Sequence, residues 1–160
     1  MAIDKSEREK AQRVIADNRK AFHDYHVLET FEAGVALLGT EVKSIREGSV
    51  SLRDSFARVE KGEVWLTNVH IGPYSHRGYA GHEERRQRKL LLHSHEIRKL
   101  TGRVAERGLT LVPLQMYFKN GRVKVALALV KGKQEHDKRE TIRRREVDRE
   151  TRAAIKERSR

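Results

Sequence analysis

The stretch YFKNGRVKVALALV (residues 117–130) carries the strongest short-range signal for the fold. Every second residue from Val123 to Leu129 is a branched aliphatic one, and the residues between them are lysine or alanine. This period of two is typical of a strand with one buried face. Asn120-Gly121 comes just before the run, and because both residues tolerate a positive φ, the pair favours a tight turn between antiparallel strands. The stretch therefore predicts a β-hairpin.

Further extended regions are expected upstream of this hairpin. A second hairpin is predicted over residues 55–71, with its turn at Lys61-Gly62. One face of it is expected to carry Trp65, Val69 and Ile71. Residues 25–38 also read as extended, and Gly34 within them indicates a bulge or a sharp bend of the kind that barrels use at their corners.

Helices are expected to be fewer than strands. Thr40 is expected to cap a short helix that runs to Arg46 and stops at Gly48, with Val42 and Ile45 on one face. A longer helix is predicted over residues 93–107, with Ile97, Leu100 and Val104 facing inward and Gly108 at its end. Ser6-x-x-Glu9 offers a capping box for a third, frail helix. Together these elements predict a mainly β protein, an OB-like closed antiparallel barrel with about three helices.

The composition indicates a partner with many negative charges. Charged residues make up 36% of the 160-residue chain, against about 25% in an ordinary globular protein, and the formal net charge is +12. The chain has no cysteine, which excludes disulfides, thiolate metal sites and cysteine nucleophiles. It also has neither an apolar run long enough to span a membrane nor the apolar core of a signal peptide near its start. We expect a soluble, cytoplasmic protein with no membrane partner.

The distribution of charge divides the chain into three parts. Residues 1–17 are expected to be an N-terminal extension, residues 18–130 the barrel, and residues 131–160 a basic tail in which 19 of 30 positions are charged. The tail has too few apolar groups to offset the entropy cost of ordering it, so we expect it to be disordered in isolation and helical on an anionic surface. The alternative is an ordinary solvated helix packed on the barrel.

The cluster His23-Asp24-Tyr25-His26 raises the possibility of catalysis. Two histidines could act as general base and general acid in a small ribonuclease. If the cluster lies in a strand, however, His23 and Tyr25 share one face, and the two histidines point apart. A surface that stacks on RNA and forms hydrogen bonds with it is the simpler interpretation. The sequence contains no Walker-type loop, nucleophile elbow or His-Glu-x-x-His motif, so we expect no enzyme, cofactor or metal site.

A series of short motifs runs in order from about residue 18 to residue 145. They are Asn18-Arg19-Lys20, His23-Asp24-Tyr25, Phe31-Glu32-Ala33-Gly34, Gly39–Ser44, Asp54-Ser55, Asn68–Ile71, Arg88–Leu92, Leu111–Leu114, Lys131-Gly132-Lys133 and Asp137-Lys138-Arg139. In this order and spacing the chain resembles the SsrA-binding protein family, also called small protein B (SmpB). The resemblance implies a partner of transfer-messenger RNA (tmRNA) in bacterial ribosome rescue, or trans-translation. It also implies an OB-like barrel and a C-terminal tail that is disordered in solution.

The resemblance also implies where the RNA binds. A barrel of this family clamps the tRNA-like domain of tmRNA, with basic residues on phosphates, His23 and Tyr25 stacking or donating hydrogen bonds, and Glu32 accepting from base or ribose donors or orienting a neighbouring arginine. The residues so implied are Asn18, Arg19, Lys20, His23, Tyr25, Glu32, Lys43, Arg46, Lys89, Leu91, Arg122, Lys124, Lys131, Gly132 and Lys133.

The tail is implied to have a separate role on the ribosome. It enters the vacant mRNA channel of the small subunit, becomes helical and stands in for codon–anticodon pairing near the decoding centre. The tail residues so implied are His136, Asp137, Lys138, Arg139, Arg143 and Ile155. Elongation factor Tu is an expected further partner in the charged tmRNA complex, and the chain is expected to be a monomer bound 1:1 to tmRNA. Two alternatives stay open: an OB-fold translation factor or ribosomal protein, and a small ribonuclease that uses His23 and His26.

Overall fold

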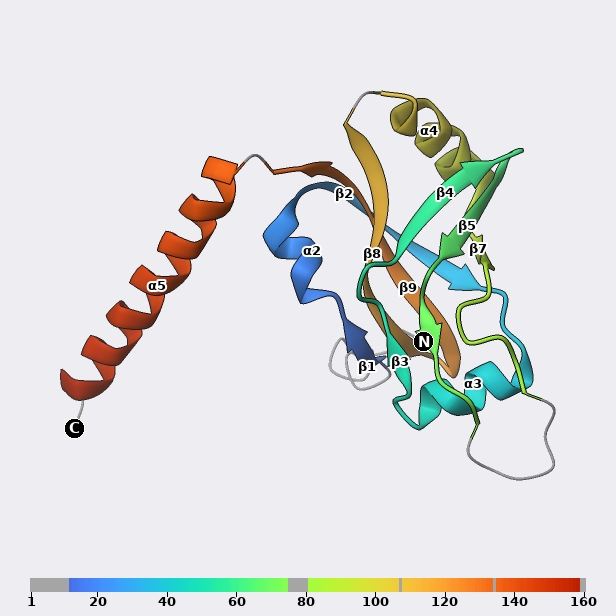
Figure 1. Cartoon of the computed structure of the whole chain (residues 1–160), viewed down its shortest axis with the longest axis horizontal. Coiled ribbons are helices and arrows are strands. Elements are labelled where there is room, and N and C mark those ends of the chain that lie inside the picture. The colour runs from blue at the N-terminus through green and yellow to red at the C-terminus, as the bar shows by residue number, and fades with distance from the viewer. Residues whose placement is uncertain (1–11, 75–80, 107, 134, 159–160) are drawn as a thin grey trace, which may run out of the picture.

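The structure is a computed structural model of the chain, and it describes residues 12–74, 81–106, 108–133 and 135–158. Figure 1 shows a group of curved strands from which a long helix extends to one side. In chain order the elements are β1 (Gln12–Asp17), α2 (Arg19–Asp24), β2 (Tyr25–Val35), α3 (Gly39–Arg46), β3 (Val50–Ser51), β4 (Phe56–Glu60), β5 (Glu63–Thr67), β6 (His70–Ile71), β7 (Arg88–Leu91), α4 (Ser94–Val104), β8 (Leu109–Lys119), β9 (Arg122–Gly132) and α5 (Glu135–Arg158).

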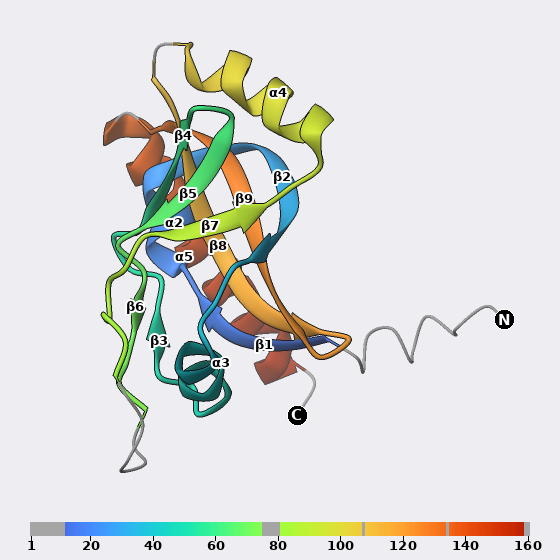
Figure 2. The ribbon, with the colours of Figure 1, turned by 90° about the vertical axis from the view of Figure 1, so that its right-hand side faces the viewer.

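The main sheet is antiparallel and closes on itself. Its seven strands follow the order β1-β8-β4-β5-β7-β2-β9, and β8 also pairs with β9. This last pairing joins β8, β4, β5, β7, β2 and β9 into a ring, while β1 is attached to β8. Helix α4 lies at one end of the ring and α3 at the other (Figure 2). The predicted mainly β, closed antiparallel barrel is confirmed, and the described residues contain three helices on the barrel and a fourth in the tail.

Both predicted hairpins are present, but the three residues expected to share one face of the second hairpin do not share it. Asn120 and Gly121 have φ values of 51° and 75°, the left-handed geometry that the tight turn between β8 and β9 requires. In the hairpin of β4 and β5, Val64 and Leu66 are fully buried, whereas Trp65 is only half-buried. The positive φ of Asn68 interrupts the alternation after β5, so the buried Val69 and Ile71 do not share a face with Trp65.

The irregularity in β2 also lies elsewhere than predicted. The register shift that marks the bulge falls between Val27 and Glu29, not at Gly34. Gly34 instead pairs with both Lys124 of β9 and Leu91 of β7. A Cβ atom at this position would lie 3.3 Å from the Cβ of Leu91. The glycine therefore allows two neighbouring strands to approach closely where β2 passes from one to the other.

The short helix α2 explains why β9 is buried on both faces near its end. Residues Val123 to Leu129 face the barrel core at every second position, as predicted. Ala128 and Val130 point the other way, yet both are fully buried because Ala21 of α2 packs with them on the outside of the barrel. Neither α2 nor strand β1 is among the predicted elements, and β1 extends the sheet upstream of the boundary expected at residue 18.

The two longer helices of the barrel follow the predicted positions. α3 begins after Leu38, whose backbone N–H donates to the Glu41 carboxylate at 2.8 Å, so the prediction that Thr40 caps this helix was wrong. Its buried side chains include Ile45, while Val42 is half-buried. α4 buries Leu100 completely, as expected. The helix predicted from Ser6 lies outside the described residues.

The tail forms the single helix α5, which runs away from the barrel in Figure 1. Its apolar residues Ile142, Val147 and Ile155 are 42%, 58% and 62% exposed. A helix with so little apolar burial gains almost nothing from packing on the barrel, which disfavours the alternative of a docked surface helix. The helical conformation is the one that the sequence predicts for the tail on an anionic surface, and its instability in the isolated protein stays a prediction.

Candidate nucleic-acid interface

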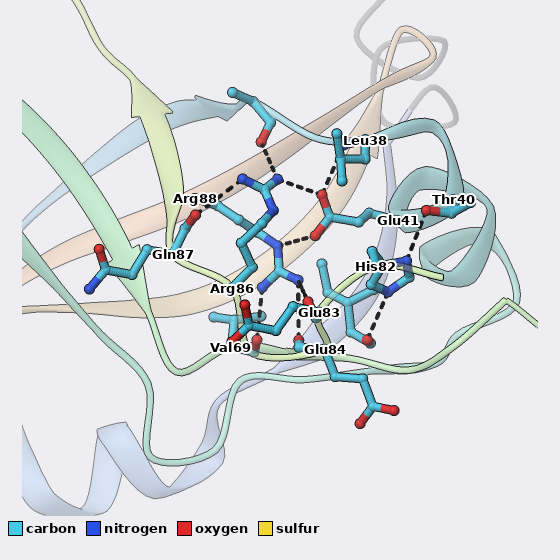
Figure 3. A network of polar contacts seen from close by, with 12 residues as sticks. Leu38, Thr40, Glu41, Val69, His82, Glu83, Glu84, Arg86, Gln87 and Arg88 are labelled. Carbon is cyan, nitrogen blue, oxygen red and sulfur yellow. Dashed lines mark hydrogen bonds and ion pairs between the residues drawn. The ribbon is translucent and has the colours of Figure 1, made fainter. Parts of the chain in front are cut away.

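A network of buried ion pairs and hydrogen bonds joins Glu41 of α3 to Arg88 of β7 and to Arg86 just before this strand (Figure 3). Arg88 is fully buried and donates to the Glu41 carboxylate and to the backbone oxygens of Val69 at 2.9 Å and Glu84 at 3.1 Å. Arg86 donates to the same carboxylate at 2.6 Å. Burial alone would raise the pKa of Glu41, but the hydrogen bonds from Arg86, Leu38 and Arg88 outweigh it and lower the pKa below its ordinary value. The Glu41 carboxylate and the Arg88 guanidinium are thus bonded to partners within the protein, which makes the network a structural support.

Asn18 connects α2 to the barrel. Its side chain is 5% exposed, its Nδ2 donates to the Pro113 carbonyl at 2.9 Å, and its Oδ1 accepts from the Ala21 N–H at 3.3 Å. Ala21 in turn packs on the outer face of β8 and β9. The amide of Asn18 is therefore bonded within the protein, where it positions α2 on the barrel.

Eight of the residues predicted to contact RNA lie together where α2 meets the start of β2 and the end of β9. We call them the Tyr25 group: Asn18, Arg19, Lys20, His23, Tyr25, Lys131, Gly132 and Lys133. Tyr25 pairs with Gly132 across the two strands, and the Lys133 N–H donates to the Asp24 carbonyl at 2.9 Å. The ammonium of Lys133 donates to the carbonyl of Phe22, which fixes the last turn of α2 beside β9. Segments that are more than 100 residues apart in the chain thus form one basic surface.

The conformation of the His23–His26 cluster differs from the prediction. Residues up to Asp24 are helical, and the strand begins only at Tyr25, where φ is −131° and ψ is 147°. His23 and Tyr25 therefore do not share a strand face. The Nδ1 atom of His23 lies 2.9 Å from Asp24 Oδ1, which orients the ring within α2. The change from helix to strand places an imidazole and a phenol ring on two adjoining elements.

A second set of predicted residues lies at the other end of β2. Glu32 is seven residues from Tyr25 along an extended strand, a separation of about 23 Å. We call Glu32, Leu91, Arg122 and Lys124 the Glu32 group. Leu91 is 53% exposed and lines a groove of about 310 Å³ together with Arg122 and Lys124. This group presents two cations and an apolar side chain beside one carboxylate.

The carboxylate of Glu32 is bonded within the protein. The Tyr117 hydroxyl donates to it at 2.6 Å, and the Lys119 ammonium donates to both of its oxygens at 3.1 and 3.3 Å. The bond from Tyr117, supported by those from Lys119, lowers the pKa of Glu32 although partial burial opposes the change. Burial and the bond to Glu32 raise the pKa of Tyr117. Glu32 thus holds a lysine and a tyrosine in place, and its contact with RNA stays a prediction.

The other predicted barrel residues lie outside both groups. Lys43 and Arg46 are on α3, where the Lys43 ammonium lies 5.2 Å from the centre of the Tyr74 ring. Lys89 is on β7, and its ammonium pairs with Glu63 at 3.1 Å. These three cations therefore extend the positive surface without belonging to one compact site.

The predicted tail residues lie along α5. His136, Asp137 and Lys138 are in its first turn, and their side chains lie outside the part of the structure that is described in detail. Arg139 and Arg143 are exposed. Ile155 lies sixteen residues beyond Arg139, about 24 Å along a helix. Because α5 begins two residues after Lys133, the tail starts next to the Tyr25 group.

Sequence reasoning missed three residues that belong to these surfaces. Tyr117 and Lys119 both bind the carboxylate of Glu32. They lie on β8, which pairs with β9, and β9 in turn pairs with β2 at Glu32. Phe22, on α2, is 47% exposed, which is unusual for a phenylalanine. In the sequence, the only indication of this role is that one aromatic residue lies between the basic Lys20 and His23.

The chemistry available on these surfaces is that of binding. Among the residues that the structure describes, no three or more histidine, aspartate or glutamate side chains are grouped as a metal site would require. No helix in the described ranges has the length and apolar character needed to cross a membrane. Clusters of lysine and arginine with adjoining aromatic rings suit phosphates and unstacked bases. A closed OB-like barrel with two such groups and a basic helical tail defines the class of small RNA-binding β-barrel proteins.

Comparison with known proteins identifies the family. The model of the SmpB protein family matches residues 15–157. An SsrA-binding protein of Syntrophobacter fumaroxidans is 61% identical over 138 residues, which cover 86% of each chain. One of Trichodesmium erythraeum is 60% identical over 147 residues, which cover 91% of this chain and 94% of the relative. The chain belongs to the SmpB family of SsrA-binding proteins.

A solved structure supports the same relationship. It is described as "tmRNA-SmpB: a journey to the center of the bacterial ribosome", and the matching chain in it is 54% identical to this one. The TM-score is 0.64, and the match covers 80% of this chain and 94% of the other. The barrel expected from the sequence is thus also the fold of a family member in a ribosomal context.

Proposed function

We propose that the protein binds the tRNA-like domain of tmRNA and acts with it on stalled ribosomes in trans-translation. The observation that carries this proposal is the match to SsrA-binding proteins at about 60% identity over nine-tenths of the chain. The basic surface supports it, because a chain with a net charge of +12 concentrates cations and aromatic rings at the junction of α2, β2 and β9.

The Tyr25 group supplies the main RNA-binding surface. Structured RNA offers phosphates, 2′-hydroxyls and a few unstacked bases. Arg19 and Lys131 contact phosphates, while His23 and Tyr25 stack on bases or donate hydrogen bonds to them. Asn18 keeps α2 in place beneath these contacts. The Glu32 group, about 23 Å away along β2, contacts a second region of the same RNA. The two groups together brace an extended, folded RNA.

The tail enters the vacant mRNA channel of the small ribosomal subunit. Its 24 helical residues span about 36 Å, enough to run along a channel. Its mean hydropathy is low and its basic residues lie on all sides, which suits a tunnel walled by rRNA phosphates. Asp137, Lys138 and Arg139 lie near the decoding centre, and Ile155 reaches deeper. In this position the tail replaces codon–anticodon pairing.

The protein works as a binding factor in the cytoplasm and catalyses no reaction. It binds tmRNA as a monomer with 1:1 stoichiometry, and elongation factor Tu joins the charged complex. The RNA is therefore expected to leave the complex uncut.

A competition experiment tests the proposal against both alternatives. Labelled tmRNA is bound to the full chain on filters and challenged with unlabelled tmRNA, bulk tRNA or rRNA fragments. The proposal predicts that only tmRNA competes efficiently, whereas an OB-fold ribosomal protein would show equal competition by rRNA fragments. The recovered RNA is then examined for 2′,3′-cyclic phosphate ends, whose appearance would indicate a ribonuclease instead.

A further inference from the structure

A groove that begins at Tyr25 extends to residues of β4 and β8 that have no role in the contacts described so far. It lies between α2, the start of β4 and the first part of β8, and its volume is about 330 Å³. Its lining includes the aromatic rings of Tyr25 and Phe56, the carboxylates of Asp24 and Asp54, and Thr110 on its β8 side. Phe56 is 42% exposed although it is a large apolar residue at the start of a strand. An aromatic side chain left this open beside a hollow indicates a place for a flat partner.

The charges around the groove decide which part of a nucleic acid can enter it. Asp24 and Asp54 both contribute to the lining, and a carboxylate repels phosphate and can only accept hydrogen bonds. Lys20 donates to Asp54 Oδ1 at 3.0 Å, so the charges of these two residues offset each other, and Asp24 adds a further negative charge to the lining. The interior of the groove is therefore unfavourable for a phosphate. It suits a flat group that carries N–H donors on its edge, as nucleobases do.

The cations that would hold the RNA backbone lie at the rim of the groove. The strand end that carries Lys131 and Lys133 pairs with β2 at Tyr25, which lines the groove. A backbone held there by its phosphates brings an adjacent base to the opening. Phosphate contacts of this kind position the RNA, whereas the contacts of the base determine which nucleotide is accepted.

We propose that this groove receives one unstacked nucleobase of the bound RNA, which stacks on Phe56 or Tyr25 and donates hydrogen bonds to Asp54. The proposal rests on the proposed function, because it takes the RNA to be tmRNA, and it adds a base-specific site formed by Phe56, Asp54 and Thr110. A base in this position would also tie α2 to β4. The groove thus adds selectivity to a surface whose other contacts are mainly to phosphates.

The proposal is tested with two variants of the full chain and a matched control. Phe56→Ala removes the exposed ring, and Thr110→Trp fills the groove from the β8 side. Val14→Ala is the control, because Val14 is 49% exposed on β1 and does not line the groove. Loss of one base stack should weaken tmRNA binding about tenfold in both groove variants. Thermal melting of each protein establishes that the variants are folded.

A second readout identifies the base. Forms of the tRNA-like domain that each lack one loop base are bound to the wild-type and Phe56→Ala proteins. One abasic position should weaken binding to the wild-type protein about tenfold, yet have no further effect on Phe56→Ala. If every abasic RNA loses the same factor with both proteins, or if both groove variants bind like the control, the groove holds no base. If the wild-type protein shows no preference for tmRNA at all, the proposed function itself is wrong.

Discussion

Replacing Glu32 by glutamine tests how a carboxylate functions on a surface that binds RNA. Glutamine keeps the shape of the side chain but removes the charge that anchors Lys119 and Tyr117. The bond from Tyr117 is a charged one of 2.6 Å, worth about 1.5–3 kcal/mol, of which a neutral bond retains about half. The ion pair with Lys119 joins side chains that are 38% and 40% exposed, so it contributes about 0.2–1 kcal/mol. The variant should therefore lose about 1–2 kcal/mol of the free energy of unfolding.

The effect on RNA binding has two opposing parts. Removal of a negative charge strengthens non-specific attraction to any RNA. In the variant Lys119 is no longer held by Glu32, so ordering its side chain on a phosphate costs about 1 kcal/mol of entropy. This cost corresponds to about fivefold in affinity. We therefore expect Glu32→Gln to weaken binding of tmRNA about fivefold and to leave binding of bulk tRNA unchanged or slightly stronger. The ratio of the two affinities is the decisive quantity.

A double-mutant cycle separates this indirect role from direct recognition. Affinities for tmRNA are measured by filter binding for wild type, Glu32→Gln, Lys119→Met and the double variant, with Glu60→Gln as a control that removes an exposed carboxylate on β4. If Glu32 acts through Lys119, its replacement has little effect in the Lys119→Met background. Effects that add to within about 0.5 kcal/mol would contradict this reasoning and show that Glu32 touches the RNA on its own.

Three other predictions follow from the same structure. Glu41→Gln leaves the buried charge of Arg88 without its carboxylate and should lower the free energy of unfolding by about 3–5 kcal/mol in urea titrations, against less than 1 kcal/mol for Glu60→Gln. Because folding lowers the pKa of Glu41, the stability that its carboxylate contributes is complete above the ordinary pKa of 4.5 and is lost as the pH falls below that value. The stability of the variant should therefore depend less on pH in this acidic range, and an unchanged pH dependence would contradict the assignment. Amide exchange of the isolated protein should find residues 135–158 unprotected, and strong protection would mean that the helix is packed. Deletion of residues 134–160 should leave tmRNA binding within a few-fold of wild type but abolish tagging on stalled ribosomes, and Ile155→Asp should impair tagging. Full tagging after the deletion would show that the tail acts only as a tether.

The features that the sequence predicted well are those determined by neighbouring residues. The turn at Asn120-Gly121 depends on two residues that accept a positive φ, and the alternation after it determines which side of β9 faces the core. The end of α3 at Gly48 depends on the same property of glycine. Each of these predictions needed only a few residues, and each was confirmed.

The features that it missed depend on contacts between distant segments. Helix α2 is only six residues long and is held by Asn18, whose partner Pro113 lies 95 positions away. The partners of Glu32 lie 85 and 87 residues beyond it, so nothing near Glu32 in the sequence indicates that its oxygens are occupied. Trp65, Val69 and Ile71 were wrongly predicted to share a face because the positive φ of Asn68, a single irregular residue, interrupts the alternation after β5.

The proposal that tmRNA is the partner is tested most directly by the RNA that the full chain carries in its native cells. The protein is crosslinked to RNA in growing cells and purified under denaturing conditions, and the attached RNA is sequenced and compared with total cellular RNA. We expect tmRNA to be enriched far above its abundance, with crosslinks in its tRNA-like domain and weaker ones in small-subunit rRNA along the mRNA channel. An RNA profile that simply follows cellular abundance would contradict the proposed function.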